Sequence, residues 1–297
     1  MEQRQEKDIS VVIASFQDPL GLYLTTFSVI SQLAKTNLNW EIILSCDGGS
    51  DTKWEKLPNV RCLRLTGGNR TGSPQGTRDA GIRAASAASV LCIESHVVIN
   101  DIASLLEVHK ALGGAITVPA RIGETAEMFS SFGYEMDWES GSFWNKRTIY
   151  SPQNGIQPWR IVGFGHAAFV IDRDWYIRSG GYCLEMKGFG GEEPDLNLLV
   201  WQTGRETWMV PSVTHAHYLT PGAHGDETIS PNFARNFCIA AYEHGGHEYL
   251  QKVETHFGYR LQKNVAIEAR RKLICGGKFG GDLNRLREHF RQEGIVS

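Results

Sequence analysis

The regular alternation of short β-branched segments with longer helical segments over residues 9–98 constrains the fold of this chain most strongly. Four apolar runs have the length and composition of buried strands: 9–14, 41–46, 60–65 and 90–93. Apolar residues recur at helical spacing over 21–36, and small residues predominate over 76–88. This order is typical of βαβ units, so we expect an α/β fold in which helices flank a mostly parallel central sheet.

The second half of the chain is less regular. Residues 121–160 are rich in aromatic residues, Gly and Ser with weak periodicity, which predicts a long irregular segment over the sheet. Further elements are expected as strands at 165–171 and 207–211 and as helices at 173–179, 192–203, 232–242 and 263–274. We therefore expect one domain over 1–220, made of a 9–98 half and a 99–220 half, followed by a helical C-terminal extension over 221–297.

Composition excludes several classes of protein. The chain has 30 Lys and Arg against 33 Asp and Glu, and this balance gives no general attraction to nucleic acid or anionic lipid. It has no run of about 20 apolar residues, and its six cysteines are scattered without CxxC spacing. We expect a soluble, cytoplasmic protein with reduced thiols that does not bind a membrane. Residues 251–297 carry 10 Lys and Arg against 5 Asp and Glu, which favours an anionic partner for this segment alone.

Polar residues follow three predicted strands at the point where each strand ends. Ser15 and Gln17 follow the first strand, Asp47 the second, and Glu94-Ser95-His96 the fourth. In open α/β sheets the ligand crevice lies at the carboxyl ends of the strands, so these residues predict a binding site. The alternative for Asp47 is an ordinary glycine-rich turn. The dinucleotide and P-loop motifs are absent from the sequence.

One acid–histidine pair and one pair of histidines have the spacing for a shared metal ion. Glu94 and His96 alternate along a strand and so face the same side, as do His215 and His217. A carboxylate with two imidazoles suits Mn²⁺, or Mg²⁺, bound to a diphosphate. We select Glu94, His96 and His215 as ligands, with His217 as the alternative to His215. The remaining histidine is then a buried structural residue.

A third cluster places three acids at the beginning of a predicted helix, directly after Gly190-Gly191. The two glycines are expected to let the backbone approach a ligand and to aim Glu192 or Glu193 into a pocket, where a carboxylate acts as a general base or holds a substrate hydroxyl. Simple helix capping is the alternative. Asp195 is expected to be structural, and residues 244–247 are expected to form a solvated loop.

Taken in chain order, SVVIAS, EIILSCDGGSD and GTRDAGIRAASAASVLCIESH resemble the nucleotide-sugar half of the GT-A glycosyltransferases of the family two type. The resemblance is sharper toward the polypeptide N-acetylgalactosaminyltransferases. Their Asp-x-His, Trp-Gly-Gly-Glu-Asn, Val-Gly-His and Asn-x-x-Arg motifs are similar, in order, to four stretches that begin at Glu94, Phe189, Val213 and Asn232. The resemblance covers residues 9 to about 243.

The resemblance implies a GT-A fold in which 1–220 is the catalytic domain, 9–98 its nucleotide-binding half and 99–220 its acceptor and catalytic half. It also implies a role for individual residues. Asp47 would contact the uracil or ribose, Arg78 would lie near the nucleotide, and the three selected ligands would approach Mn²⁺ and the diphosphate. Glu192 and Glu193 would face the donor sugar and the acceptor hydroxyl. The chain departs from the family pattern at Glu94, which replaces Asp, at Phe189, which replaces Trp, and at Tyr218, which replaces Arg.

The predicted activity is that of a hexosyl- or N-acetylhexosaminyltransferase, which moves a sugar from a UDP-sugar to an acceptor hydroxyl. The acceptor is a peptide, a glycan or, as the minority alternative, a hydroxymethylated DNA base. Both stereochemical outcomes, retention and inversion, stay open. Two other functions remain: a nucleotidyltransferase that releases pyrophosphate, and a sugar-nucleotide-binding protein with impaired catalysis.

Overall fold

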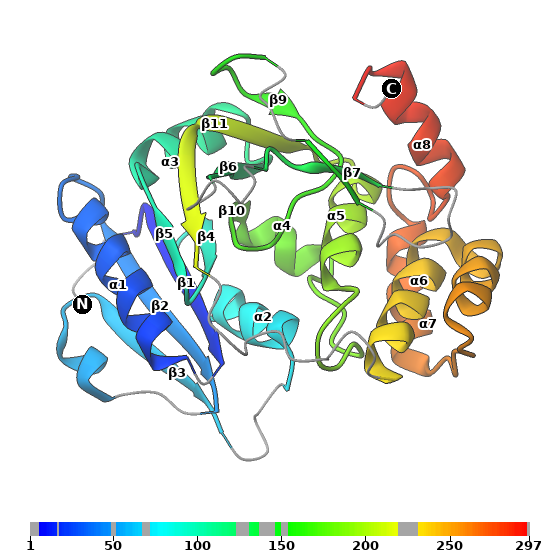
Figure 1. The fold of residues 1–297 in the computed structure, drawn as a ribbon, viewed down its shortest axis with the longest axis horizontal. Helices are drawn as coiled ribbons and strands as arrows, with labels where there is room; N and C mark the ends of the chain where they lie inside the picture. The colour runs from blue at the N-terminus through cyan, green and yellow to red at the C-terminus, as the bar shows by residue number, and fades with distance from the viewer. Residues whose placement is uncertain are drawn as a thin grey trace.

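The computed structural model describes residues 6–16, 18–48, 52–66, 72–122, 131–136, 146–149, 154–218 and 231–295. A mixed sheet lies at the centre of the described chain, in the order β3-β2-β1-β4-β10-β6-β11-β5, with β9 paired to β11 (Figure 1). Its strands are β1 (Ile9–Phe16), β2 (Trp40–Asp47), β3 (Val60–Leu65), β4 (Ser89–Glu94), β5 (Val97–Ile99), β6 (Ile116–Ile122), β9 (Trp159–Arg160), β10 (Ala168–Asp172) and β11 (Thr207–His217). A separate hairpin pairs β7 (Tyr134–Met136) with β8 (Lys146–Thr148).

Helices cover the sheet and extend beyond it. They are α1 (Pro19–Leu33), α2 (Pro74–Ala84), α3 (Ile102–Ala111), α4 (Arg173–Arg178), α5 (Glu192–Gln202), α6 (Pro231–Phe257), α7 (Val265–Cys275) and α8 (Leu283–Gln292), with a short 3-10 helix, η1 (Thr52–Lys56). None of the described helices combines the length and hydropathy that crossing a bilayer demands. The α/β class with a central sheet flanked by helices is confirmed.

The parallel half of the sheet matches the predicted βαβ pattern. Strand β1 pairs in parallel with both β2 and β4, and β2 pairs in parallel with β3. The other half is mixed, because β10 runs antiparallel to both β4 and β6. No helix is seen in the described residues between β6 and β10, and a parallel return normally needs such a crossover. The overall sheet is therefore less parallel than the first 98 residues suggest.

The local sequence accounts for the two helices nearest the polar strand ends. Helix α1 begins at Pro19 and is capped by Asp18, whose carboxylate accepts a hydrogen bond from the Gly21 N–H. Helix α2 begins at Pro74 and is capped in the same way by Ser73. Gly81 lets α2 lie directly on β1, since a Cβ there would come within 2.3 Å of Val12 Cγ1.

The C-terminal helices pack on α5 rather than on the sheet. A large buried cluster joins Leu198 and Trp201 of α5 to Phe237 of α6 and to Leu286 and Phe290 of α8. The Trp201 and Phe290 rings meet edge to face, with centroids 4.8 Å apart. In Figure 1, α6, α7 and α8 accordingly lie together on the side of the molecule next to α5.

Several expectations about the second half of the chain need correction. Residues 244–247 do not form a solvated loop: they lie at a kink within α6, where Gly246 has a φ of +72°, and the His244 side chain is fully buried while His247 is exposed. Strand β11 continues past the predicted end at residue 211 as far as His217. Helices α3 and α8 and strand β6 were not predicted. Much of the aromatic-rich segment 121–160 lies outside the described residues.

Candidate functional site

The carboxyl ends of three parallel strands bring the predicted residues to one rim of the sheet. Ala14 is paired with Glu94 across β1 and β4, and Phe16 is paired with Asp47 across β1 and β2, so the two acids lie on either side of the end of β1. Asp47 is buried and accepts a hydrogen bond from the Gly72 N–H at 2.8 Å. Ser15 is buried between them. Gln17 lies outside the described residues.

Three potential metal ligands converge at this rim: Glu94, His96 and His217. Glu94 Oε2 lies 2.8 Å from His217 Nε2 and 3.4 Å from His96 Nε2, and the two imidazole nitrogens are 3.1 Å apart. The turn after β4 brings His96 next to β5, whose Val97 is paired with His217. The short edge strand β5 therefore closes the triangle.

The geometry and chemistry of this triangle fit a divalent ion. Ligand atoms that share an octahedral ion with bonds of about 2.1 Å lie roughly 3 Å apart, and the observed separations of 2.8, 3.1 and 3.4 Å bracket that value. One carboxylate oxygen and two imidazole nitrogens form a mixed donor set that accepts Mn²⁺. Among the described residues Nδ1 of His217 is buried without a hydrogen-bond partner, so the polar contacts of this ring are made through Nε2, and the ring also lies against His96.

Arg78 holds the Glu94 carboxylate from the other side. The Arg78 guanidinium forms an ion pair with Glu94 Oε1, which leaves Oε2 facing the two histidines. Burial raises the pKa of Glu94, but Arg78 and the hydrogen bonds from His217 and His96 outweigh this and hold it well below its usual range. Burial lowers the pKa of His96, but Glu94 and Asp18 outweigh it and raise the pKa. The cluster therefore keeps an ionised carboxylate in a largely buried place.

His215, which we selected from the sequence, does not join the converging atoms, whereas the alternative His217 does. The strand register gives the reason: His217 is opposite Val97, next to His96, but His215 is opposite Ile99, two residues farther along β5. His215 is only 4% exposed. Burial, and then the charges of His217 and Arg121, lower its pKa to about 3, so the ring is neutral.

The predicted acids Glu192 and Glu193 begin α5, close to Arg78. Glu192 is buried. Burial lowers the pKa of Arg78, but the charge of Glu94 raises it more, and the charge of Glu192 acts in the same direction. Glu193 is half-buried and its Oε1 accepts a hydrogen bond from the His166 N–H at 3.3 Å. His166 in turn lies 2.9 Å from the Tyr182 hydroxyl through Nδ1.

Gly190 and Gly191 allow a close approach to helix α6. A Cβ on Gly190 would come within 2.3 Å of the Phe233 ring, and one on Gly191 within 2.9 Å of Asn236. The close approach seen in the structure is therefore that of α6. The Asn236 amide donates to the carbonyls of Lys187 and Gly190 and fixes this loop. Sequence reasoning missed Asn236. The signal that could have found it is a polar residue within an otherwise apolar helical stretch.

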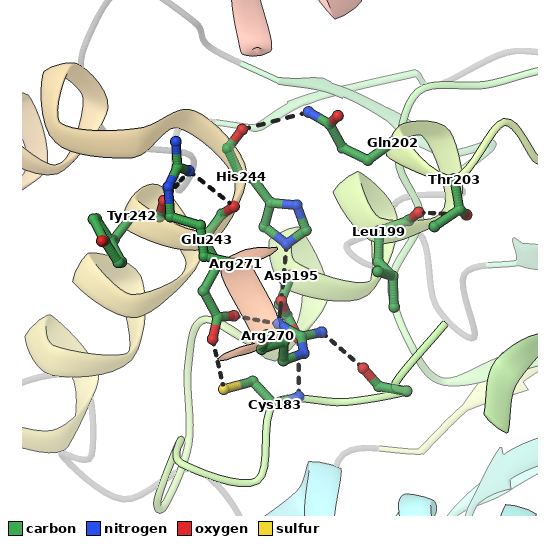
Figure 2. Close-up of polar contacts among 11 residues, drawn as sticks. Cys183, Asp195, Leu199, Gln202, Thr203, Tyr242, Glu243, His244, Arg270 and Arg271 are labelled. Carbon is green, nitrogen blue, oxygen red and sulfur yellow. Dashed lines mark hydrogen bonds and ion pairs between the residues drawn. The ribbon is translucent and has the colours of Figure 1, made fainter. Parts of the chain in front are cut away.

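Asp195 is structural, as expected, and belongs to a buried ionic cluster behind the site (Figure 2). Its carboxylate accepts hydrogen bonds from Arg270 of α7 at 2.7 and 3.0 Å and lies 2.9 Å from Nε2 of His244 in α6. Arg270 also pairs with Glu243, which accepts a weak hydrogen bond from the Cys183 thiol. Asp195, Glu243 and His244 are near enough to share an ion, but the Arg270 guanidinium already supplies the positive charge. The cluster fastens α5 to α6 and α7.

Comparison with known proteins is consistent with this architecture. The chain is 26% identical over 226 residues to human polypeptide N-acetylgalactosaminyltransferase 16, which covers 70% of this chain and 39% of that protein. It is 27% identical over 241 residues to Drosophila melanogaster N-acetylgalactosaminyltransferase 6, which covers 73% of this chain and 35% of that protein. The chain thus spans well under half the length of these relatives.

Solved structures match almost the whole fold. The crystal structure of GalNAc-T7 with UDP, GalNAc and Mn²⁺ superposes with a TM-score of 0.75 at 18% identity, over 98% of this chain and 58% of that one. The structure of S. aureus TarS 1-349 superposes with a TM-score of 0.52 at 12% identity, over 97% and 74% of the two chains. The fold is therefore the GT-A fold. The sequence profile described as Glycosyl transferase family 2 matches residues 10–180, more than half of the chain, and the protein belongs to that family.

Proposed function

We propose that this protein transfers a sugar from a UDP-sugar to an acceptor hydroxyl and that it uses a divalent metal ion, Mn²⁺ or Mg²⁺. The observation that supports this most directly is the triangle of Glu94 Oε2, His96 Nε2 and His217 Nε2 at the carboxyl rim of the sheet. Membership of glycosyl transferase family 2 supports the reaction class. The GalNAc-T7 structure, which contains UDP and Mn²⁺, supports the choice of donor and ion.

Glu94, His96 and His217 would hold the ion. A bound divalent ion neutralises negative charge on a departing diphosphate. Arg78 keeps Glu94 ionised and turned toward the histidines, since its guanidinium occupies the other carboxylate oxygen. Asp47, on the other side of β1, is the residue proposed to contact the uracil or ribose. Because the metal-binding residues, Arg78 and Asp47 are already in place, little reorganisation of the protein is needed when charge develops during the reaction.

Glu192 and Glu193 are proposed to act on the sugar side of the reaction. In an inverting reaction Glu193, the more exposed of the two, would accept the proton of the acceptor hydroxyl at its carboxylate. In a retaining reaction the two carboxylates would instead hold hydroxyls of the donor and acceptor. The names of the relatives support a peptide hydroxyl as the acceptor, ahead of a glycan or a modified DNA base.

The metal site has a matched pair of test variants on one strand. His217→Leu and His215→Leu each remove a buried imidazole from β11, but only His217 belongs to the triangle. We expect wild-type protein to show a rise in melting temperature with Mn²⁺ and one UDP-sugar that EDTA removes, because a ligand that binds only the folded state stabilises it. His217→Leu should lose this rise, and His215→Leu should keep it. Loss in His215→Leu alone would refute the ligand assignment.

The donor and the chemistry are tested separately. A panel of UDP-, GDP- and TDP-sugars with Mn²⁺ identifies the donor by the same thermal shift, and UDP release then reports turnover, including slow hydrolysis without an acceptor. Glu192→Gln and Glu193→Gln should bind the donor yet turn over at least about 100-fold more slowly. Unimpaired turnover in a variant that carries both Glu192→Gln and Glu193→Gln would overturn the roles proposed for both acids. Release of pyrophosphate from a nucleoside triphosphate would favour a nucleotidyltransferase instead.

A further inference from the structure

The short strand β5 lies at the edge of the central sheet and depends on helix α1 for the hydrogen bonds on its outer side. It is three residues long, and among the described strands it pairs with β11 alone. Residues of an antiparallel pair turn their N–H and C=O groups alternately toward the partner strand and away from it. Val97 turns both groups away from β11, toward α1. Val97 is fully buried, so these two groups need a partner inside the protein.

The Thr25 hydroxyl of α1 satisfies both groups. Thr25 Oγ1 donates a hydrogen bond to the Val97 carbonyl at 2.8 Å and accepts one from the Val97 N–H at 2.9 Å. A hydroxyl can do this because it is a donor and an acceptor at one atom. One turn later, the Ser28 hydroxyl makes a longer contact of 3.5 Å with the Ile99 carbonyl. Helix α1 therefore takes the place of a neighbouring strand along the outer side of β5 (Figure 1).

Val97 is connected to both imidazoles of the metal triangle, which consists of Glu94, His96 and His217. It directly follows His96 in the chain, and it is paired with His217 across β5 and β11. At the same end of β5, the Tyr218 N–H donates to the His96 carbonyl at 2.9 Å. A displacement of Val97 would therefore change the 3.1 Å separation of the two Nε2 atoms in the triangle.

His217 depends on this backbone pairing more than His96 does. The Asp18 carboxylate lies 3.1 Å from Nδ1 of His96, and a metal-bound histidine is usually oriented by such a partner. Nδ1 of His217 has no hydrogen-bond partner in the described part of the chain. The place of the His217 ring is therefore set by the backbone of β11, which at this end is paired with Val97.

We propose that Thr25 is a positioning residue of the metal site: its hydroxyl fixes Val97, and through Val97 it fixes the distance between His96 and His217. The inference rests on the proposed function, because it takes the triangle as the site of the metal ion. Thr25 itself is fully buried in α1 and does not belong to the triangle. Asp18 at the beginning of α1 and Thr25 two turns later then both hold the triangle, so this helix is the support of the site.

Three variants of the full chain separate positioning from stability. Thr25→Val keeps the volume of the side chain but removes the hydroxyl, so that both backbone groups of Val97 lose their partner. Thr25→Ser keeps the hydroxyl and loses a buried methyl group. Thr26→Val is the matched control, because Thr26 is the next residue and is equally buried, but its hydroxyl donates to the Leu22 carbonyl of its own helix.

Titration with Mn²⁺, followed by electron paramagnetic resonance, measures the positioning. We expect Thr25→Val to weaken Mn²⁺ binding about tenfold, because the loss of a group that holds metal ligands in place costs at least about that much. Thr25→Ser and Thr26→Val should keep the wild-type affinity. Urea unfolding verifies that all variants are folded, and it should show that Thr25→Ser loses stability without losing affinity.

Hydrogen exchange of the metal-free protein gives a second readout. The Val97 amide should exchange faster in Thr25→Val than in Thr26→Val, because only the first change removes its acceptor. An unchanged exchange rate, or equal loss of Mn²⁺ affinity in Thr25→Ser, would overturn the role of the hydroxyl. If wild type and Thr25→Val bind Mn²⁺ equally tightly, this inference fails and the proposed function stands. A wild type that binds no Mn²⁺ would overturn the metal site and this inference with it.

Discussion

The carboxylate of Asp18 lies 3.1 Å from Nδ1 of His96, so the residue that caps α1 also orients a residue of the metal triangle. The same carboxylate accepts a hydrogen bond from the Ser95 hydroxyl at 3.0 Å. A carboxylate at Nδ1 fixes the tautomer of the ring and leaves the Nε2 lone pair for a ligand. Helix α1 and the turn after β4 are thereby joined at the site.

We predict that Asp18→Ala weakens Mn²⁺ binding by about 10- to 100-fold, because a partner that orients a metal-bound histidine contributes about that much. Titration with Mn²⁺ followed by electron paramagnetic resonance measures the effect. Asp101→Ala is the matched control, since Asp101 caps α3 in the same way but lies outside the triangle. Asp101→Ala should cost about 1 kcal/mol of stability and leave the affinity for Mn²⁺ unchanged. If both variants lose the same affinity for Mn²⁺, Asp18 acts as a helix cap and does not orient His96 for the metal ion.

The buried ionic cluster of Figure 2 gives a prediction about stability. Arg270→Ala leaves the carboxylates of Asp195 and Glu243 without their cation, and both are fully buried. We expect a loss of about 3–5 kcal/mol in the free energy of unfolding, measured with urea at pH 7. Arg271→Ala should cost less, because Arg271 donates to the backbone carbonyls of Tyr242 and Glu243 and lies over the Tyr242 ring, so its loss leaves no buried carboxylate without a cation. If both variants lose the same stability, the cluster does not fasten α5 as described.

The same cluster predicts a dependence of stability on pH. Burial raises the pKa of Glu243 from 4.5 to about 7, although Arg270 opposes the change. The folded protein therefore binds a proton that the unfolded chain releases, and this contribution is complete below about pH 4.5 and is lost as the pH rises through about 7. Asp195 has the opposite sign: Arg270 and His244 outweigh burial and lower its pKa from 3.8 to about 2, so its contribution is lost only on strong acidification.

Glu243→Gln separates this effect from the other titrations. Wild-type protein should lose up to about 3 kcal/mol relative to Glu243→Gln between pH 5 and pH 8, since the glutamine side chain has no proton to release. Urea unfolding of both proteins across this range provides the comparison. Parallel curves for the two proteins would mean that Glu243 stays ionised beside Arg270 throughout.

The sequence predicted best where a single segment determines its own structure. The strands and helices of residues 9–98 follow from periodicity, and the polar strand ends were correctly expected to meet at one rim because parallel strands share a direction. The sequence alone could not decide whether His215 or His217 joins Glu94 and His96. Alternation puts both rings on one face, and only the pairing of Val97 with His217 distinguishes them, through a strand of three residues that is too short to predict.

Contacts between segments far apart in the chain could not be predicted from the sequence either. The sequence signalled a close approach at Gly190-Gly191 but not the partner, which comes from α6 more than forty residues later. The sequence predicts His244 in a solvated loop, yet the side chain is fully buried and lies 2.9 Å from Asp195. Helix α8 did carry a readable signal, since Leu283, Leu286 and Phe290 recur at helical spacing and are buried.

The contact between Gly190 and Phe233 gives the last prediction. Gly190 has a φ of +95°, and a Cβ there would lie 2.3 Å from Phe233 Cδ2, so Gly190→Ala introduces both backbone strain and a clash. Gly258→Ala is the control for strain alone, because Gly258 has a φ of +61° and no heavy atom within 4 Å of the added Cβ. We expect about 1 kcal/mol of destabilisation for Gly258→Ala and a further 1–3 kcal/mol or so for Gly190→Ala.

The clash is isolated by a double-mutant cycle with Phe233→Ala. Removing the ring should relieve the clash but not the strain, so the double variant should be less destabilised than the sum of the two single variants. Urea unfolding measures all four proteins. Since Glu192 and Glu193 directly follow the loop, Gly190→Ala should also slow UDP release more than Gly258→Ala does, even where both remain folded. An additive cycle would mean that the loop moves away from α6 freely, and the positions of the two acids would then not depend on this contact.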